Sequence, residues 1–332
     1  MERRMNGMPP PTTIPPASGA GSSAGPRNLL RRLPSLVRNL STADIVAFER
    51  AWHQRADPPV LADPYARLLC GPLLGLAARF RPLGWYVAKV ELGRIMPASM
   101  VVVIRARYAE QALESAVEQG VSQYVMVGAG MDSFPFRRPD LAERVAIYEI
   151  DHPAVQRRKL ERIRRAGLDV SSTHHFIGAD LTEVTVVDAL MSSSFDTARP
   201  AFLSLLGVAY YLTPDALEAT ARSIAARLSP GSCIVVDYLL DQASSAPRSG
   251  GVRSNLLELV EDCGEPMRSE YSLDQMDALM RRSGFEPVDA CAADDLEDAY
   301  RRELGSLPFE VPGIFGIGTF AVAGPRDRGE AG

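Results

Sequence analysis

The chain has 332 residues, enough for one large α/β domain with additions or for two smaller domains. Hydrophobic residues make up 46% of it and charged residues 23%, which is typical of a soluble globular protein. The formal net charge of −5 argues against a nucleic-acid partner, because proteins that bind phosphate backbones usually carry a surplus of Lys and Arg.

Cysteines and histidines show no pattern of metal binding. The four cysteines form no Cys-x-x-Cys pair, and the four histidines have no zinc-ligand spacing. We therefore expect reduced thiols, no metal and a cytoplasmic location. No apolar run reaches the roughly 20 residues that span a bilayer, and Pro, Gly, Ser and Thr follow Met1–Arg4 where a signal peptide would be apolar, so no membrane partner is expected. The oligomeric state is left open, with a homodimer as one expectation.

The first part of the chain divides into a tail and a helical region. Residues 1–40, rich at the start in Pro, Gly and Ser, are expected to be disordered or poorly ordered. Residues 41–119 are expected to form a helical cap. Its first helix is predicted with Thr42 as N-cap and with Ile45, Phe48, Glu49 and Trp52 at helical spacing. A second helix is expected to open at Asp63-Pro64.

Residues 120–323 alternate between strand and helix patterns, which predicts a mostly parallel sheet. Helices are expected after His152, Thr213 and Ser272. An insert at 241–270 is polar and looks like a loop or mobile lid, and an acidic stretch, Asp294–Glu303, joins the last two strands. The expected strands are Gln123–Val127, Val145–Ile150, His175–Gly178, Pro200–Leu206, Ser232–Leu239, Phe285–Ala290 and Ile314–Val322.

A glycine turn follows the first expected strand, within Val125–Asp132. Ligands of such sheets bind at the carboxyl ends of the strands, and Gly128 and Gly130 would let the backbone approach a nucleoside closely. Ser133 stands where the dinucleotide fingerprint has its third glycine. A tight strand-to-helix turn without a ligand is the alternative.

Acidic residues end the next two expected strands. Asp151 lies about 20 residues beyond the glycine turn, where a carboxylate can bind both hydroxyls of a ribose. This favours S-adenosylmethionine over NAD, because the acid would repel a pyrophosphate, although NAD enzymes also use an acid here. Asp180 ends the third strand; it either accepts a hydrogen bond from an adenine amino group or caps the following helix.

These features belong to an ordered series of motifs. In this respect the chain resembles the bacterial branch of the leucine carboxyl methyltransferase-like family of S-adenosylmethionine-dependent O-methyltransferases, from about Ser41 to Val322. The resemblance implies a Rossmann-like methyltransferase sheet of about seven mostly parallel strands, with the last antiparallel, and an N-terminal helical cap. The series consists of Arg105-Ala106-Arg107-Tyr108, Val127–Ser133, Tyr148–Pro153, Gly178–Leu181, Leu206–Thr213 and Val236-Asp237-Tyr238.

The resemblance also implies residue roles. Arg105 matches the arginine that binds the methionine carboxylate, with Arg107 as the nearby fallback. Gly128 and Gly130 would line the methionine and ribose, Asp151 would bind the ribose, and Asp180 with Leu181 the adenine. The expected cofactor-binding residues are Arg105, Gly128, Ala129, Gly130, Asp132, Asp151, His152, Asp180 and Leu181.

The identity of the methyl acceptor is less defined. Tyr211 matches a tyrosine beside the acceptor pocket, and Tyr210 and Tyr211 either orient the acceptor or pack in the core. Carboxyl-methylating relatives carry Glu at the position of Leu206, so their acceptor cannot be transferred to this chain. His152 is a candidate general base by residue type only. The helical cap and the insert are expected to cover the acceptor, with Trp52, Phe80, Trp85 and Tyr86 offering apolar surface.

The predicted activity is therefore methyl transfer from S-adenosylmethionine to a carboxylate or hydroxyl of a small molecule, such as a natural-product intermediate. Positioning would do most of the catalytic work. An NAD(P)-dependent oxidoreductase on a similar sheet and a non-catalytic cofactor-binding homologue are the alternatives.

Overall fold

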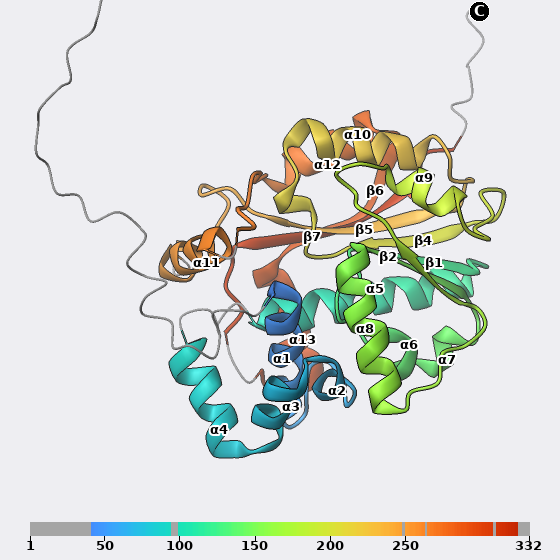
Figure 1. Ribbon diagram of the computed structural model, residues 1–332. Helices are drawn as coiled ribbons and strands as arrows, with labels where there is room; N and C mark the ends of the chain where they lie inside the picture. Colours follow the sequence, from blue (N-terminus) through green and yellow to red (C-terminus); the bar gives the residue numbers. More distant parts are fainter. Residues whose placement is uncertain (1–40, 94–98, 248–249, 263, 308–309, 325–332) are drawn as a thin grey trace, which may run out of the picture. The chain divides into compact units, whose positions relative to one another are not determined.

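The computed structural model describes residues 41–93, 99–247, 250–262, 264–307 and 310–324. Within them the strands form one seven-stranded sheet in the order β3-β2-β1-β4-β5-β7-β6 (Figure 1). β7 is antiparallel to both neighbours and the other strands share one direction, as expected from the sequence. The strands are β1 (Gln123–Val127), β2 (Ala146–Asp151), β3 (His174–Gly178), β4 (Ala201–Leu205), β5 (Cys233–Leu239), β6 (Phe285–Ala292) and β7 (Phe315–Val322).

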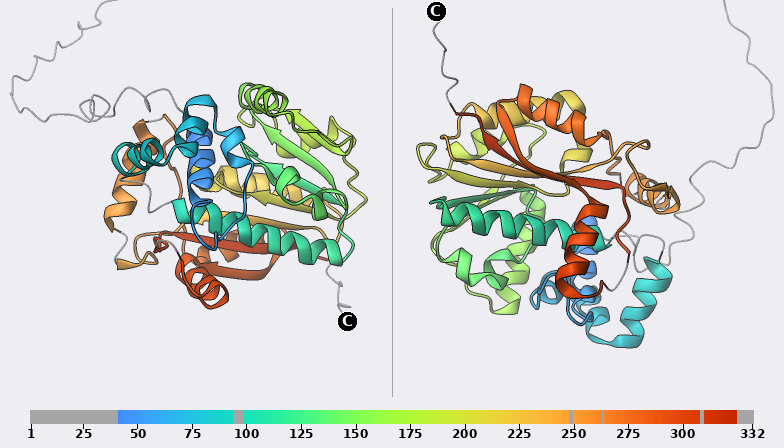
Figure 2. Two further views of the ribbon diagram at one scale, coloured as in Figure 1. Left: turned by 90° about the horizontal axis from the view of Figure 1, so that it is seen from below. Right: turned by 180° about the vertical axis from the view of Figure 1, so that it is seen from behind.

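Helices cover both faces of the sheet, which buries its central strands. In β1, Tyr124 and Met126 join one hydrophobic core while Val125 and Val127 join the other, because successive side chains of a strand point to opposite faces. One face carries α5 (Ser99–Glu118), α6 (Phe134–Arg137), α7 (Pro139–Ala142), α8 (Pro153–Ala166) and α13 (Ala293–Leu304); the other carries α9 (Val186–Met191), α10 (Pro214–Ala225) and α12 (Leu273–Arg282). Figure 2 shows α5 lying along its face of the sheet.

Three helices begin where the sequence predicted. The imidazole of His152 accepts a hydrogen bond from the Ala154 amide at the start of α8. Thr213 caps α10 by accepting from the Ala216 amide, and Ser272 forms a capping box at the start of α12. These bonds satisfy amides that have no partner within the helix.

The N-terminal helices depart from the sequence prediction at two positions. α1 (Thr42–His53) has Ser41, not Thr42, as N-cap, because the Ser41 hydroxyl forms a capping box with Asp44. α2 (Ala66–Leu69) begins at Ala66 and not at Pro64; the Asp63 carboxylate binds the Ala66 amide and fixes the later start. α3 (Pro72–Arg79), α4 (Arg81–Tyr86) and the π-helix η2 (Val87–Glu91) complete this region.

Two helices lie in segments that the sequence, because of their polar character, predicted as a loop or lid and as an acidic connection. The insert contains α11 (Gly250–Asp262), and the acidic stretch before β7 folds into α13. Both helices are amphipathic: Leu256 and Val260 of α11, and Leu296 and Tyr300 of α13, pack on the protein at a spacing of four residues. The predicted tail, residues 1–40, lies outside the described residues.

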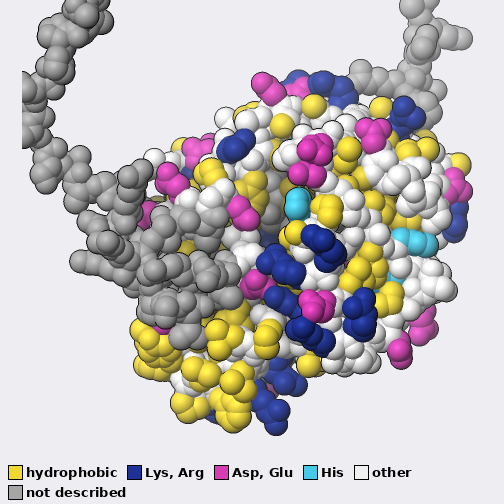
Figure 3. Space-filling view, in the orientation of Figure 1, with side chains coloured by type: hydrophobic (Ala, Val, Ile, Leu, Met, Phe, Trp, Pro, Cys, Tyr) yellow, Lys and Arg dark blue, Asp and Glu magenta, His cyan; other side chains and the backbone are white. Residues whose placement is uncertain are grey.

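Large apolar side chains are exposed on α3 and α4, where Figure 3 shows them gathered at the lower left. They include Leu73, Leu76, Phe80, Trp85 and Tyr86. None of the helices among the described residues is long and apolar enough to cross a membrane.

Candidate functional site

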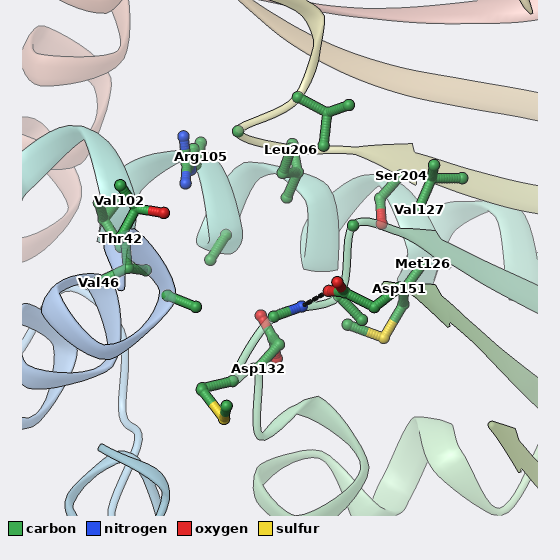
Figure 4. A pocket seen from close by; sticks show the side chains of 18 of the residues that line it. Thr42, Val46, Val102, Arg105, Met126, Val127, Asp132, Asp151, Ser204 and Leu206 are labelled. Atoms are coloured by element: carbon green, nitrogen blue, oxygen red, sulfur yellow. Dashed lines mark hydrogen bonds between the residues drawn. The ribbon is translucent and has the colours of Figure 1, made fainter. Parts of the chain in front are cut away.

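A cavity of about 260 Å³ lies at the carboxyl ends of β1, β2 and β4, and α1 and α5 form its other walls (Figure 4). We call it the strand-end cavity. Open α/β sheets bind ligands at this edge. Of the residues predicted to bind cofactor or acceptor, those that line it are Arg105, Gly128, Ala129, Gly130, Asp132, Asp151, Tyr210 and Tyr211.

Three predicted residues, His152, Asp180 and Leu181, do not line this cavity. His152 caps α8 and is exposed. The Asp180 carboxylate accepts hydrogen bonds from the amide and hydroxyl of Thr182, so it stabilises a local turn; Thr185 caps the following helix. The His152 ring lies 3.8 Å from Asp180, between Nε2 and Oδ2, so the two residues form a small polar surface at the ends of β2 and β3.

The glycine turn after β1 requires glycine at its first position. Gly128 has φ +71°, and a Cβ atom there would lie 2.5 Å from Cγ2 of Val208. Gly130 has φ +53°, but a Cβ atom there would meet nothing closer than 3.7 Å. The left-handed conformation and the closeness of Val208 leave no room for a side chain at Gly128, so the backbone itself forms this part of the cavity wall.

Asp151 links the end of β2 to this turn. Its Oδ2 accepts a hydrogen bond of 2.6 Å from the Gly130 amide, and its Oδ1 one of 2.7 Å from the His152 amide. Burial raises the pKa of Asp151, and these two amide bonds oppose the increase. Each oxygen keeps a further lone pair, so the carboxylate can also accept hydrogen bonds from a ligand in the cavity.

Arg105 reaches the cavity from α5 and is held by two partners. Its Nη1 donates to Oδ2 of Asp237 at 2.8 Å and to the Tyr210 hydroxyl at 3.1 Å. Burial alone would lower the pKa of Arg105, but Asp237 and Tyr210 raise it above its usual range. Both bonds use Nη1, so the other guanidinium nitrogens remain to donate to an anion.

Arg107, the alternative arginine, points elsewhere. It donates to the Val60 carbonyl at 2.6 Å, pairs with Glu303 and lies over the ring of Tyr300. The geometry therefore favours Arg105 as the anion-binding arginine of the strand-end cavity.

Asp132 lines the cavity but is engaged by the protein itself. Its two oxygens each accept a hydrogen bond of 2.6 Å, one from Arg50 and the other from Arg137. Burial would raise the pKa of Asp132, but the two guanidinium groups hold it well below its usual range. Asp63 also pairs with Arg50, so this buried network fixes α1 against the turn after β1.

A second, apolar cavity of about 80 Å³ adjoins the first. Ile45 and Glu49 of α1 line it, as do Leu259 of α11 and Phe315 of β7. The two cavities share six lining residues, Thr42, Val46, Val102, Arg105, Tyr210 and Tyr211. The cap helix α1 and the insert therefore both contribute to this site.

The aromatic residues expected to offer apolar surface to an acceptor lie elsewhere. Trp52 and Trp85 line a separate cavity with Arg55 and Arg81, and Phe80 and Tyr86 line neither the strand-end nor the apolar cavity. Leu206, at the position where the resemblance implies an acid in carboxyl-methylating relatives, lines the strand-end cavity.

Sequence reasoning missed two residues of the site. Asp237 lies in the motif Val236-Asp237-Tyr238, to which the resemblance assigns no role, although a carboxylate inside an Ile- and Val-rich strand indicates a buried partner. The sequence predicts only a helical spacing of Glu49 with Ile45 and Phe48; its place as an acid on the apolar face of that helix is the signal that indicates a functional carboxylate.

The sheet order, the glycine turn after β1 and the acid at the end of β2 together define a Rossmann-like methyltransferase. The family model for leucine carboxyl methyltransferase matches residues 43–225, and the chain belongs to this family. Family membership confirms the resemblance drawn from the motifs, and with it an S-adenosylmethionine-dependent methyltransferase as the class of enzyme.

Similar proteins agree with this assignment. A Bacillus subtilis (strain 168) protein named "Putative S-adenosyl-L-methionine-dependent methyltransferase YktD" is 29% identical over 285 residues, covering 78% of this chain and 90% of its own. A Mycobacterium marinum (strain ATCC BAA-535 / M) protein with the same description, without the name YktD, is 30% identical over 210 residues, covering 62% and 67%.

Solved structures support the fold. A "putative methyltransferase" from Thermobifida fusca YX matches with a TM-score of 0.53 at 16% identity, covering 88% of this chain and all of its own. A duf574 family protein from Streptomyces avermitilis MA-4680 matches with a TM-score of 0.55 at 14% identity, covering 83% and 97%.

Proposed function

We propose that the strand-end cavity binds S-adenosylmethionine and that the enzyme methylates an oxygen atom of a small molecule held in the apolar cavity. One observation carries this proposal: Arg105, the glycine turn and Asp151 come from three separate elements and line one cavity. A guanidinium suits the methionine carboxylate, and a carboxylate at the end of β2 suits the ribose hydroxyls.

The cofactor residues then run from α5 along the strand-end cavity and past its edge towards the end of β3. Arg105 binds the carboxylate of the methionine part, and the backbone of Gly128, Ala129 and Gly130 lines the methionine and ribose. Asp151 binds the ribose hydroxyls. The adenine extends beyond the cavity towards Asp180 and its neighbours His152 and Leu181, which lie at the ends of the adjacent strands. Asp132 supports this wall through Arg50 and Arg137 and does not itself bind the cofactor.

The bound cofactor supplies an electrophilic methyl group on a positively charged sulfur. The residues of the chain position the acceptor and exclude water. Tyr210 and Tyr211 lie between the two cavities, and burial raises the pKa of Tyr210 to about 12 although Arg105 opposes this increase. Both tyrosines are therefore neutral at physiological pH and can donate hydrogen bonds to an acceptor oxygen.

The acceptor is a small molecule with an apolar body and a carboxylate or hydroxyl group. It enters the apolar cavity from the side that α1 and α11 cover. The lining of the apolar cavity supports this, since most of it is aliphatic or aromatic. A natural-product intermediate has this character. The net charge of −5 makes a nucleic-acid acceptor less suitable.

Calorimetric titration with S-adenosylmethionine, S-adenosylhomocysteine and NAD(P) tests the proposal. We expect both sulfur cofactors to bind in the micromolar range and NAD(P) not to bind. Binding of NAD(P) alone would overturn the proposal in favour of an oxidoreductase. Binding of S-adenosylmethionine without methyl transfer to any member of a broad acceptor panel would indicate a non-catalytic homologue.

A further inference from the structure

Glu49 is a buried acid in the apolar cavity. It lies in α1, is 4% exposed and lines the cavity beside aliphatic side chains. Within the described residues no hydrogen bond or ion pair is found for its carboxyl group, and the one charge that acts on it is that of Arg105. By contrast, Glu149, which is also buried, binds both Lys159 and His174. A buried carboxyl group without a partner is costly, so its presence in a ligand cavity points to a ligand.

The groups that face Glu49 do not neutralise it. Arg105 approaches from α5, but its charge is already paired with Asp237. Tyr210 and Tyr211 face it from η4 (Ala209–Tyr211), and burial raises the pKa of both. Among the residues that the structure describes, α11 and β7 contribute only apolar side chains to the cavity. Burial raises the pKa of Glu49 to about 8, and the charge of Arg105 offsets only part of the increase.

We propose that Glu49 is the general base for an apolar acceptor that carries a hydroxyl group, such as a phenol, bound in the apolar cavity. This inference rests on the proposed function, because the methyl donor must lie in the adjoining strand-end cavity. In the transfer step the acceptor oxygen forms a bond to the methyl carbon while the carbon–sulfur bond breaks. The O–H bond breaks at the same time, its proton moves to the Glu49 carboxylate, and its electron pair stays on oxygen. The carboxyl group afterwards releases this proton to solvent.

The environment of Glu49 selects a hydroxyl over other acceptors. A carboxylate acceptor is already ionised and needs no base, and its charge would lie beside that of Glu49 in an apolar cavity. A protonated amine would enter beside the permanent charge of Arg105. A neutral phenol brings no charge, gains from the apolar lining and has a proton that a carboxylate can accept.

The experiment compares wild-type enzyme with Glu49→Gln, using three matched probes: 2-naphthol, 2-naphthoic acid and 2-naphthylmethylamine, whose aliphatic amino group is protonated at neutral pH. Methyl transfer from S-adenosylmethionine is measured by mass spectrometry, and probe binding is measured by calorimetry on protein loaded with S-adenosylhomocysteine. Glu258→Gln is the matched control, because Glu258 is exposed on α11 and undergoes the same chemical change. Cofactor affinity is determined separately for each protein.

We expect 2-naphthol to bind and to be methylated. We expect the acid and the amine neither to bind nor to be methylated. Glu49→Gln should lower kcat for 2-naphthol at least about 100-fold, with cofactor affinity changed less than twofold, while Glu258→Gln resembles wild type. In wild type, kcat/KM should rise with pH around 8, as Glu49 ionises. In Glu49→Gln, kcat/KM should rise only with the ionisation of the acceptor.

Three results would overturn the inference: unchanged kcat in Glu49→Gln, preference for 2-naphthoic acid or 2-naphthylmethylamine, or no binding of 2-naphthol to the loaded protein. Each leaves the proposed function standing if wild-type protein binds S-adenosylmethionine. Failure of the wild type to bind that cofactor would instead overturn the proposed function.

Discussion

The carboxylate of Asp237 binds the guanidinium of Arg105 with one oxygen and the amide of Gly207 with the other, at 2.8 and 2.6 Å. It thereby joins β5, α5 and the turn after β4 at one point beside the strand-end cavity. A Cβ atom on Gly207 would lie 2.8 Å from Nη2 of Arg105, so the arginine is packed closely against this turn. The position of Arg105 therefore depends on Asp237, which does not itself line the strand-end cavity.

Replacement of Asp237 by Asn should damage both stability and cofactor binding. The substitution leaves the largely buried charge of Arg105 without its partner, which typically costs about 3–5 kcal/mol. We expect the free energy of unfolding to fall by about this amount in urea, and the affinity for S-adenosylmethionine to fall at least tenfold. Glu303→Gln, which breaks the half-exposed pair with Arg107, is the control and should cost less than about 1 kcal/mol. Equal losses in the two variants would contradict the role of Asp237.

The two arginines of α5 should differ in what they recognise. Arg105→Ala should weaken S-adenosylhomocysteine binding at least tenfold, because its guanidinium faces the strand-end cavity, whereas Arg107→Ala should change it less than twofold. Calorimetry with 5′-methylthioadenosine, which lacks the amino-acid part, provides the internal control: its affinity should be similar in wild type and Arg105→Ala. Parallel losses for both ligands would show that Arg105 supports the fold and does not bind the carboxylate.

Asp151 should contribute more to cofactor binding than Asp180. Asp151→Asn removes the charge beside the proposed ribose, and we expect at least a tenfold loss of affinity for S-adenosylmethionine, measured by calorimetry. Asp180→Asn should lower affinity by less, because its carboxylate is exposed and already engaged by Thr182. Unchanged affinity in Asp151→Asn would refute the ribose contact. A larger effect at Asp180 would place the nucleoside nearer β3.

Gly128→Ala should be more harmful than the same change at another left-handed glycine. At Gly128 the new methyl group meets Val208 at 2.5 Å in addition to the backbone strain, whereas at Gly167, with φ +66°, it meets nothing within 4 Å. Thermal unfolding should show a loss of about 1 kcal/mol for Gly167→Ala and a clearly larger one for Gly128→Ala. Adding Val208→Ala should recover part of the difference; no recovery would mean that Val208 is not the source of the clash.

The sequence predicted the sheet because its central strands β1, β4 and β5 are short apolar runs that are buried almost throughout. It also identified the glycine turn and Asp151, since their signals are local. Contacts between distant segments could not be predicted in this way. The pairing of Arg105 with Asp237 joins residues 132 positions apart, and the network around Asp132 depends on how α1 docks. α11 was missed because its apolar stripe is narrow and its neighbours are polar, so only packing shows which side is buried.

Glu49 should make the stability of the protein depend on pH. Folding raises the pKa of Glu49 from an ordinary value of 4.5 to about 8, mainly through burial. The folded state therefore binds this proton more tightly than the unfolded state. The contribution of the protonated Glu49 to the free energy of unfolding is fully present below pH 4.5. It decreases as the pH rises towards 8 and is lost above that value.

Glu49→Gln removes this dependence, because the amide does not ionise. The free energy of unfolding in urea should differ little between wild type and Glu49→Gln at pH 4.5. The variant should then become more stable than wild type as the pH rises to 8, by an amount on the order of a few kcal/mol. Glu258→Gln controls for the general pH dependence, since Glu258 is exposed. A constant difference between wild type and Glu49→Gln over this range would show that Glu49 titrates normally in the folded protein and that its carboxyl group is solvated.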